Sequence, residues 1–328
     1  MRLILACFTV LVPLAAQHTL APRDHWNPQL NLAPAVRPLR AFAAAGDAAV
    51  TGFSVTPLPT VQFVAIEGGA AVPLPVQVPL NQPVVAARGL WLLTFYPGAP
   101  GGEPRQFILR HLQSGTEHRL PASSGFLAAA LSDNRAAILE PAPTGGLLRI
   151  YRLPDAWLET ELAVSRHPAD VFLSFASDHR LLLVGKSDYR VTPVLLSTQP
   201  GAAREEPVRE LSGPEVTDSR RKSNPTFGLG TISTSSPNRG KYTTLAHLTT
   251  RAGNDLFLFT PAHPADGLRL VEFNADGEET ATHVIKFADR DAARSATLRL
   301  GPIQVIATGQ EDILIPSRDG RVWRFARP

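Results

Sequence analysis

Two stretches of the chain repeat one another: FLAAALSDNRAAILE at residues 126–140 and VFLSFASDHRLLLVG at residues 171–185. In each, a Ser-Asp-x-Arg tetrapeptide (Ser132–Arg135 and Ser177–Arg180) joins two apolar runs. Asp and Asn tolerate the backbone conformations of tight turns, so both stretches predict β-hairpins. A third copy lies at Ser236–Lys241, again followed by an apolar run. The repeat predicts a fold built from similar antiparallel units.

The third copy, Ser-Pro-Asn-Arg-Gly-Lys, resembles the Ser-Pro-Asp-Gly-Lys hairpin of WD40-like, TolB-like and YVTN-type β-propellers, with Arg239 as an extra residue. The first two copies lack its Pro and Gly, and the Gly-His and Trp-Asp dipeptides of strict WD40 repeats are absent. The resemblance spans roughly residues 83–328 and implies a fold, not a function. It implies an all-β, single β-propeller of four-stranded blades, and dividing the length of the mature chain by the repeat of about 40–45 residues gives six or seven of them. A pair of β-sandwiches is the alternative.

The expected blades cover residues 49–80, 83–121, 123–165, 169–212 and 226–287, followed by a C-terminal blade that N-terminal strands would complete. Composition agrees with an all-β chain: 44% of the 328 residues are hydrophobic, and 30 Pro and 24 Gly interrupt them too often for a helical bundle. Residues 156–164 are the best window for a short helix. The net charge of +3 and the absence of a basic stripe argue against a nucleic-acid partner.

The N-terminus predicts export. Arg2 precedes an apolar run from Leu3 to Ala16 that ends in small residues, as in a secretory signal peptide cleaved before Gln17. The run is shorter than the ~20 residues of a membrane span; a buried strand is the alternative. We therefore divide the chain into a signal peptide (1–16), a Pro-rich leader (17–48) and a propeller (49–328), in a periplasmic or extracellular protein.

Lipidation at Cys7 is not favoured, because cleavage before this residue would leave almost no hydrophobic segment upstream. Cys7 is the only cysteine, so the mature chain would hold no disulfide and no thiolate nucleophile. The four tryptophans are expected to pack in the core or at strand edges, and Trp91 and Phe95, at even spacing on one strand, are both expected to be buried.

Two sets of residues are candidates for binding. The long polar stretch 198–228 could hold an anionic ligand through Arg220, Arg221, Lys222 and Asn224, or could be a solvated insertion. If Ser114-Gly115 is a two-residue hairpin turn, His111 and His118 lie opposite each other and could share a metal ion. The sequence nominates no third ligand, so we expect no metal and no other cofactor.

Two functional hypotheses follow. The first is a monomeric, non-catalytic binding module for a protein or envelope component, since no catalytic motif occurs. The second is a lactonase-like propeller hydrolase with a polar or metal site on the axis. Acidic or histidine residues at equivalent positions of several blades would favour the hydrolase. Asp133 and Asp178 do recur in this way, but in turns.

Overall fold

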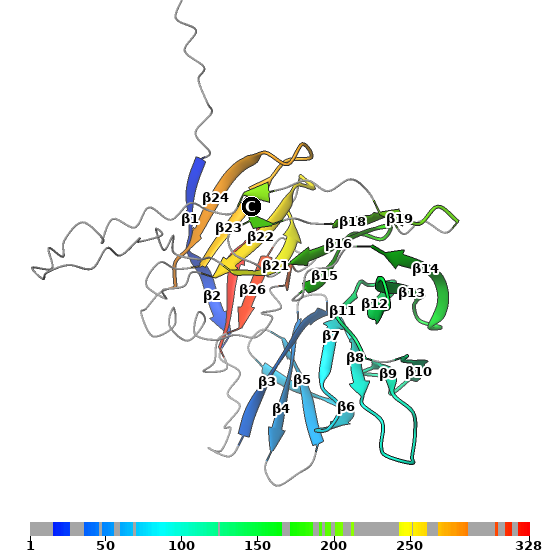
Figure 1. Cartoon of the computed structure of the whole chain (residues 1–328). Coiled ribbons are helices and arrows are strands. Elements are labelled where there is room, and N and C mark those ends of the chain that lie inside the picture. Colours follow the sequence, from blue (N-terminus) through cyan, green and yellow to red (C-terminus); the bar gives the residue numbers. More distant parts are fainter. Residues whose placement is uncertain are drawn as a thin grey trace, which may run out of the picture.

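The computed structural model describes an all-β chain (Figure 1). The described residues are 16–26, 36–45, 48–55, 60–67, 70–123, 125–165, 171–185, 190–191, 194–197, 201–205, 211–212, 243–250, 252–260, 268–287, 306–307, 312–316 and 321–328. They form strands and turns, and none of them lies in a helix long and apolar enough to cross a membrane.

Four sheets follow one another along the chain, each with four antiparallel strands. The first consists of β3 (Val36–Ala45), β4 (Ala48–Val55), β5 (Thr60–Glu67) and β6 (Ala70–Pro79). The second consists of β7 (Val84–Arg88), β8 (Trp91–Tyr96), β9 (Gln106–His111) and β10 (Glu117–Pro121). The third consists of β11 (Ala128–Leu131), β12 (Arg135–Ala142), β13 (Gly145–Arg152) and β14 (Trp157–Val164). The fourth consists of β15 (Val171–Ser177), β16 (Arg180–Gly185), β18 (Val194–Ser197) and β19 (Arg204–Glu205).

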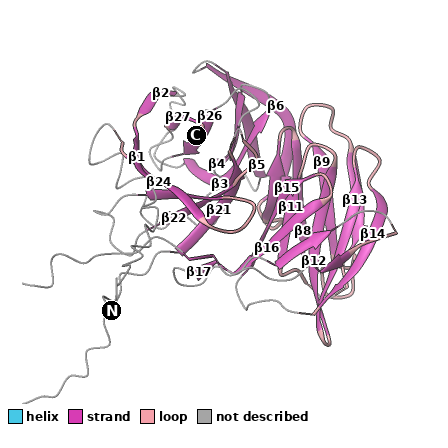
Figure 2. Ribbon diagram, turned by 90° about the horizontal axis from the view of Figure 1, so that it is seen from above, coloured by secondary structure: helices cyan, strands magenta, loops and turns pink. Residues whose placement is uncertain are grey.

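The remaining sheets combine both ends of the chain. β21 (Thr243–Thr249), β22 (Asp255–Thr260), β23 (Leu268–Phe273) and β24 (Glu279–Ile285) form a sheet to which β1 (Ala16–Leu20) adds a fifth, parallel strand. β25 (Ile306–Ala307), β26 (Asp312–Pro316) and β27 (Val322–Ala326) pair with β2 (Pro22–Trp26). β17 (Arg190–Val191) and β20 (Leu211–Ser212) form a two-stranded ribbon. Figures 1 and 2 show β1 beside β24, and β2 beside the C-terminal strands.

The first strand of each large sheet contacts the first strand of the next. The contacts run in the order β3, β7, β11, β15, β21 and β25, and β25 contacts β3 again. The ring therefore closes, as in a propeller whose innermost strands surround the axis. Because β2 supplies the outermost strand of the C-terminal sheet, the N-terminal part completes the last blade, as the sequence analysis expected.

The core lies between neighbouring sheets. Leu148 and Ile150 of β13 pack in one cluster with Leu181 and Leu183 of β16. Phe257 on β22 packs in another cluster with residues of β16. The sheet that contains β16 thus buries both of its faces. Residues of β12 likewise alternate between two apolar clusters, which explains the continuous buried run of this strand.

The prediction of six or seven four-stranded blades is wrong. The described residues form five four-stranded blades instead of six or seven, and their other large sheet has five strands. Dividing the chain length by the repeat assumes that each residue belongs to a consecutive repeat. However, β1 and β2 join sheets whose other strands are more than 220 residues away. The window 156–164 is a strand and not a helix, because β13 pairs along it.

The two repeated hairpins are confirmed: Ser132–Arg135 joins β11 to β12, and Ser177–Arg180 joins β15 to β16. The third copy, Ser236–Lys241, lies outside the described residues, as do residues 1–15 of the predicted signal peptide. Within the predicted leader, the structure describes β1, β2 and β3.

Candidate functional site

Polar residues of the repeated turns connect neighbouring blades. Ser132 holds its own turn, because its Oγ accepts the backbone N–H of Asn134 at 3.3 Å and of Arg135 at 3.0 Å. The side chain of Asp133 projects from this turn to Arg88 of the preceding blade, at 3.1 Å. On the other side, Asn134 Nδ2 donates to Asp178 Oδ2 of the following blade at 3.4 Å. The repeated turns of successive blades therefore contact one another.

Arg135 anchors this connection beneath the surface. Its Nε and Nη2 donate to the two carboxylate oxygens of Glu159 on β14, at 2.7 and 3.1 Å, and its Nη1 donates to the Asp178 carbonyl at 3.0 Å. The two side chains are only 10% and 15% exposed. The hydrogen bond from Arg135 lowers the pKa of Glu159 despite the opposing effect of burial. Glu159 thus stays ionised, and Arg135 links two blades.

A second inter-sheet connection joins Ser174 on β15, His247 on β21 and Asp255 on β22. The Ser174 Oγ lies 2.9 Å from His247 Nδ1, and His247 Nε2 lies 3.0 Å from Asp255 Oδ1. The His247 side chain is fully buried, and Ser174 is half-buried. Burial alone would raise the pKa of Asp255, but the hydrogen bond and charge of His247 and the charge of Arg180 outweigh burial and lower it. An ionised Asp255 accepts a hydrogen bond from His247 Nε2, and His247 Nδ1 lies within hydrogen-bonding distance of the Ser174 hydroxyl.

Serine, histidine and aspartate in this order are the elements of an activated nucleophile. In the usual triad Nε2 faces the serine and Nδ1 faces the aspartate. Here His247 Nδ1 faces Ser174 and Nε2 faces Asp255. The Ser174 Oγ also lies 3.5 Å from the His247 carbonyl oxygen. Its neighbours on the same strand face, Phe172 and Ala176, pack against the apolar cluster between the sheets. The contacts can brace two sheets or activate a serine. The sequence carried no signal for them, since Ser174 and His247 are 73 residues apart.

The predicted histidine pair is not formed. His118 pairs with Leu109, and the backbone N–H of His111 donates to Thr116 O, so the register differs by two residues from that of a two-residue turn. The cause is a longer loop, closed by Ser114, whose backbone N–H and side chain contact His111 Nδ1 at 3.1 and 2.9 Å. Both imidazoles instead flank Trp91, which is half-buried, as is Phe95, rather than buried.

The described residues contain no group of three or more His, Cys, Asp or Glu side chains suited to a metal ion. The predicted anion-binding residues Arg220, Arg221, Lys222 and Asn224 lie outside the described part of the chain.

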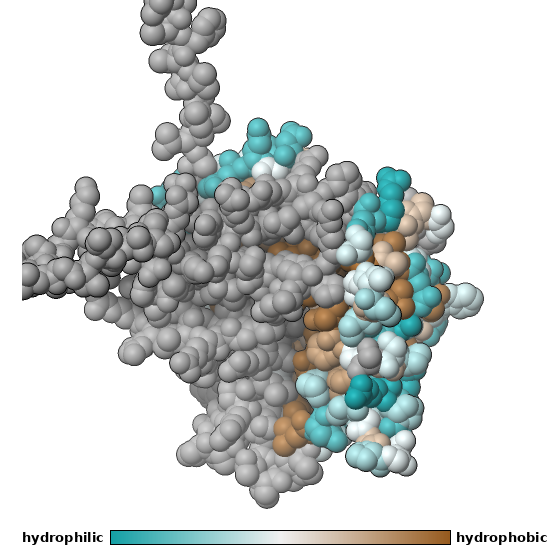
Figure 3. All heavy atoms as spheres, in the orientation of Figure 1, coloured by the Kyte–Doolittle hydropathy of each residue, from teal (hydrophilic) through white to brown (hydrophobic). Residues whose placement is uncertain are grey.

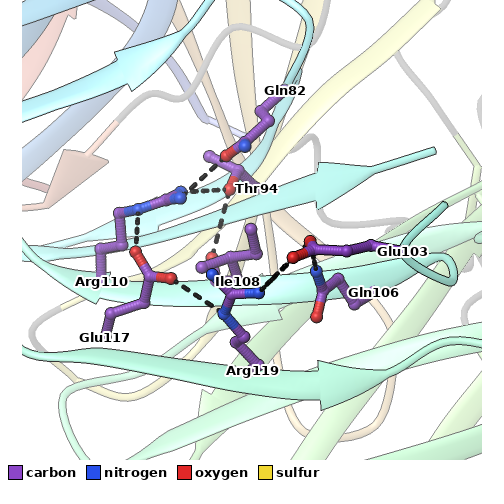
Figure 4. Close-up of polar contacts among 8 residues, drawn as sticks. All are labelled: Gln82, Thr94, Glu103, Gln106, Ile108, Arg110, Glu117 and Arg119. Carbon is purple, nitrogen blue, oxygen red and sulfur yellow. Dashed lines mark hydrogen bonds and ion pairs between the residues drawn. The ribbon is translucent and has the colours of Figure 1, made fainter. Parts of the chain in front are cut away.

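The buried cation Arg110 has a role within its own blade. It donates to Glu117 Oε2 at 3.0 Å, Thr94 Oγ1 at 2.7 Å and Gln82 Oε1 at 2.8 Å, as Figure 4 shows. These partners come from β10, β8 and the segment before β7. Arg110 therefore ties the strands of one blade together.

Some apolar side chains are exposed on the surface. On the face seen in Figure 3, hydrophobic residues gather along one margin of the described part, and hydrophilic residues cover much of the rest. Trp157, at the start of β14, is nevertheless 70% exposed, and its neighbour Leu158 is 42% exposed. The expectation that Trp157 packs in the core or against a strand edge is wrong. Ala156, immediately before it, has a φ of 55°, a conformation that is uncommon for residues other than glycine.

No protein-family model matches the chain, and no curated protein matches it. Among solved structures, the β-propeller domain of the Trilobed protease from Pyrococcus furiosus matches 90% of this chain and 94% of its own, with 8% identity and a TM-score of 0.50. The β-propeller domain of Myceliophteria thermophila Cps50 (Swd1) matches 94% of this chain and 100% of its own, with 11% identity and a TM-score of 0.46. At these identities the likeness concerns the fold alone. Together with the closed ring of sheets, the likeness to the Trilobed protease domain identifies the fold of the chain as a β-propeller.

Proposed function

We propose that the chain is an exported, monomeric, non-catalytic β-propeller that binds a protein partner in the cell envelope or outside the cell. The observation that carries the proposal is the exposure of Trp157 and Leu158 on β14. Tryptophan is enriched among the residues that dominate the energy of protein interfaces. β14 is also the last strand of its sheet, so one of its backbone edges has no partner strand in that sheet.

The backbone before Trp157 supports this assignment. Ala156 lies in the left-handed region, and strain of this kind persists at functional positions more often than elsewhere. Arg152, opposite Trp157 in the β13–β14 pair, is also exposed. The end of the β13–β14 hairpin thus presents an aromatic ring and a cation together, as many protein-binding surfaces do.

The recurrent acidic residues support a binding module over an enzyme. Asp133 and Asp178 occupy equivalent turns, but they contact Arg88 and Asn134 of neighbouring blades. Their carboxylates therefore join blades, and they are not directed to a shared ligand.

The test uses the purified protein immobilised and exposed to envelope extract from its native host, with the bound protein identified and its Kd then measured. Trp157→Ala should weaken binding by about 2 kcal/mol, or roughly thirtyfold in Kd. Val72→Ala, at an exposed apolar position of β6, is the matched control and should leave Kd unchanged. A wild-type protein that retains no partner, or equal Kd values for the two variants, would overturn the proposal.

Export is tested separately by expressing the full chain and a chain without residues 2–16 in a bacterial host. The full chain should be recovered outside the cytoplasm with Gln17 as its first residue, and the shortened chain should remain in the cytoplasm. Recovery of the full chain in the cytoplasm with Met1 still present would refute export without bearing on the binding surface.

The alternative function is that of a hydrolase, and the contacts of Ser174, His247 and Asp255 favour it. A fluorophosphonate probe, which reacts with activated serines, separates the two. If the serine only braces the sheets, the wild type is not labelled. Labelling that disappears in Ser174→Ala would establish a serine hydrolase and refute the non-catalytic assignment.

A further inference from the structure

The N-terminal strand β1 is attached through a pair of histidines. β1 runs parallel to β24, and the register places His18 opposite His283. Their rings are stacked, with centroids 5.4 Å apart and an angle of 23° between the planes. β1 pairs only with β24 among the described strands, so its attachment depends on this one interface. We call His18 and His283 the β1 histidine pair.

His283 is poorly placed to carry a proton. Its side chain is 8% exposed, and neither ring nitrogen has a hydrogen-bond partner in the described structure. A carboxylate oxygen of Glu272 lies 3.6 Å from Nε2, while the other oxygen of Glu272 accepts a hydrogen bond from Asn254 at 2.6 Å. Burial lowers the pKa of His283; Glu272 opposes this effect without cancelling it, and His18 adds to it.

The other elements packed near the pair are mostly apolar. Leu20 of β1 and Ile285 of β24, two residues along from the histidines on the same face, belong to the cluster that contains Trp323 and Phe325 of β27. Arg327, just after β27, donates to the carbonyl and hydroxyl oxygens of Thr249. Glu272 is therefore the one carboxylate that the described structure places against His283, and His18 is the facing titratable group.

We propose that acidification releases β1 from β24, because docked β1 stacks the His18 ring on the buried His283 imidazole and so disfavours a proton there. The folded state disfavours protonated His283, so its pKa is lower in the folded than in the unfolded chain. At pH values above the unfolded pKa of about 6.5, the histidine pair therefore stabilises the docked strand. This stabilisation is lost as the pH falls through the folded pKa of His283. Release exposes the outer backbone edge of β24, to which a strand of another molecule can add. The acid release of β1 does not depend on the proposed binding at Trp157.

Hydrogen–deuterium exchange of the full chain at pH 8 and pH 5 tests the proposal, with times corrected for the intrinsic effect of pH on exchange. Peptides covering residues 17–21 should lose protection at pH 5 by up to about thirtyfold, because pH 5 lies about 1.5 units below the unperturbed histidine pKa of about 6.5. Peptides from β12 should keep their protection. Loss of protection in both would show global acid unfolding and overturn the proposal.

Two substitutions make the test specific. His283→Gln removes the buried imidazole whose protonation the docked strand disfavours, so β1 should remain protected at pH 5. His111→Gln, a change at a histidine of another blade, is the control and should behave as the wild type. Equal protection of wild-type β1 at both pH values, or acid release of His283→Gln equal to that of the wild type, would refute the proposal.

Discussion

Glu159→Gln tests whether the buried ion pair beneath the repeated turn holds two blades together. The substitution keeps the size of the side chain but removes the charge that compensates Arg135, and both side chains are at least 85% buried. Breaking a buried pair costs about 3–5 kcal/mol, because the remaining charge is left without its partner. Asp178 still lies 3.9 Å from Arg135. We therefore expect the lower end of that range, about 3 kcal/mol.

The loss is measurable by urea unfolding and by calorimetry. An unfolding entropy of about 2.1 cal/mol/K per residue gives about 0.7 kcal/mol/K for this chain, so about 3 kcal/mol lowers Tm by about 4 °C. The pH dependence has a defined sign. Since the pKa of Glu159 is lowered in the folded state, its contribution is present above the unfolded pKa of about 4.3 and disappears as the pH falls through the folded value. The difference between wild type and variant should accordingly shrink in acid.

Glu161→Gln is the matched control. Glu161 is two residues away on β14 and also contacts an arginine, Arg149 at 2.8 Å, but its side chain is 48% exposed. Arg149 in addition retains Glu140 as a partner. An exposed pair of this kind contributes about 0–1 kcal/mol. Equal losses of stability in the two variants would refute the argument that burial makes the Arg135–Glu159 pair important.

Three further predictions concern single positions. Gly145→Ala should cost more than about 2 kcal/mol in urea unfolding, because at a φ of 129° its Cβ would collide with the Val164 carbonyl oxygen. Gly115→Ala, with a φ of 76° and open space around it, should cost only about 1 kcal/mol. Asp255→Asn should lower Tm at pH 7, and the difference should shrink below pH 4 as wild-type Asp255 loses its charge, because its folded pKa is lowered. Trp157→Ala should change the unfolding free energy by less than about 0.5 kcal/mol, since the ring is mostly in solvent.

Local patterns in the sequence predicted the hairpins and two blades well. The Ser-Asp-x-Arg turns occur where the tetrapeptides predicted them, and the expected blades 83–121 and 123–165 enclose β7–β10 and β11–β14. These features follow from residues close together in the chain, where alternating burial and turn residues act directly. The pairing of β1 with β24 involves residues such as Gln17 and Thr282, and no local pattern connects them.

The candidate site was harder to predict for the same reason. The predicted strand register, which placed His111 opposite His118, was wrong by two residues. Ser114 closes a longer loop by hydrogen bonding to His111, and turn statistics do not contain such side-chain contacts. The contacts of Ser174 with His247 depend on how two sheets face each other. Trp157 was misassigned because its exposure reflects its place on the outermost strand, and the number and order of strands decide that place.

The N-terminal strands explain how the C-terminal sheets are covered. β1 and β2 are separated only by Ala21, yet they pair with the outer strands of two different sheets, β24 and β27. The backbone N–H of Lys286 donates to Leu20 at 2.9 Å, and Arg23 of β2 pairs with Asp312 of β26 at 3.0 Å, so the segment 16–26 is fastened on both sides. Protonation of the β1 histidine pair would act on one of these attachments and leave the ion pairs of β2 with β26 and β27 intact. β2 would then keep the last blade closed while the edge of β24 opens.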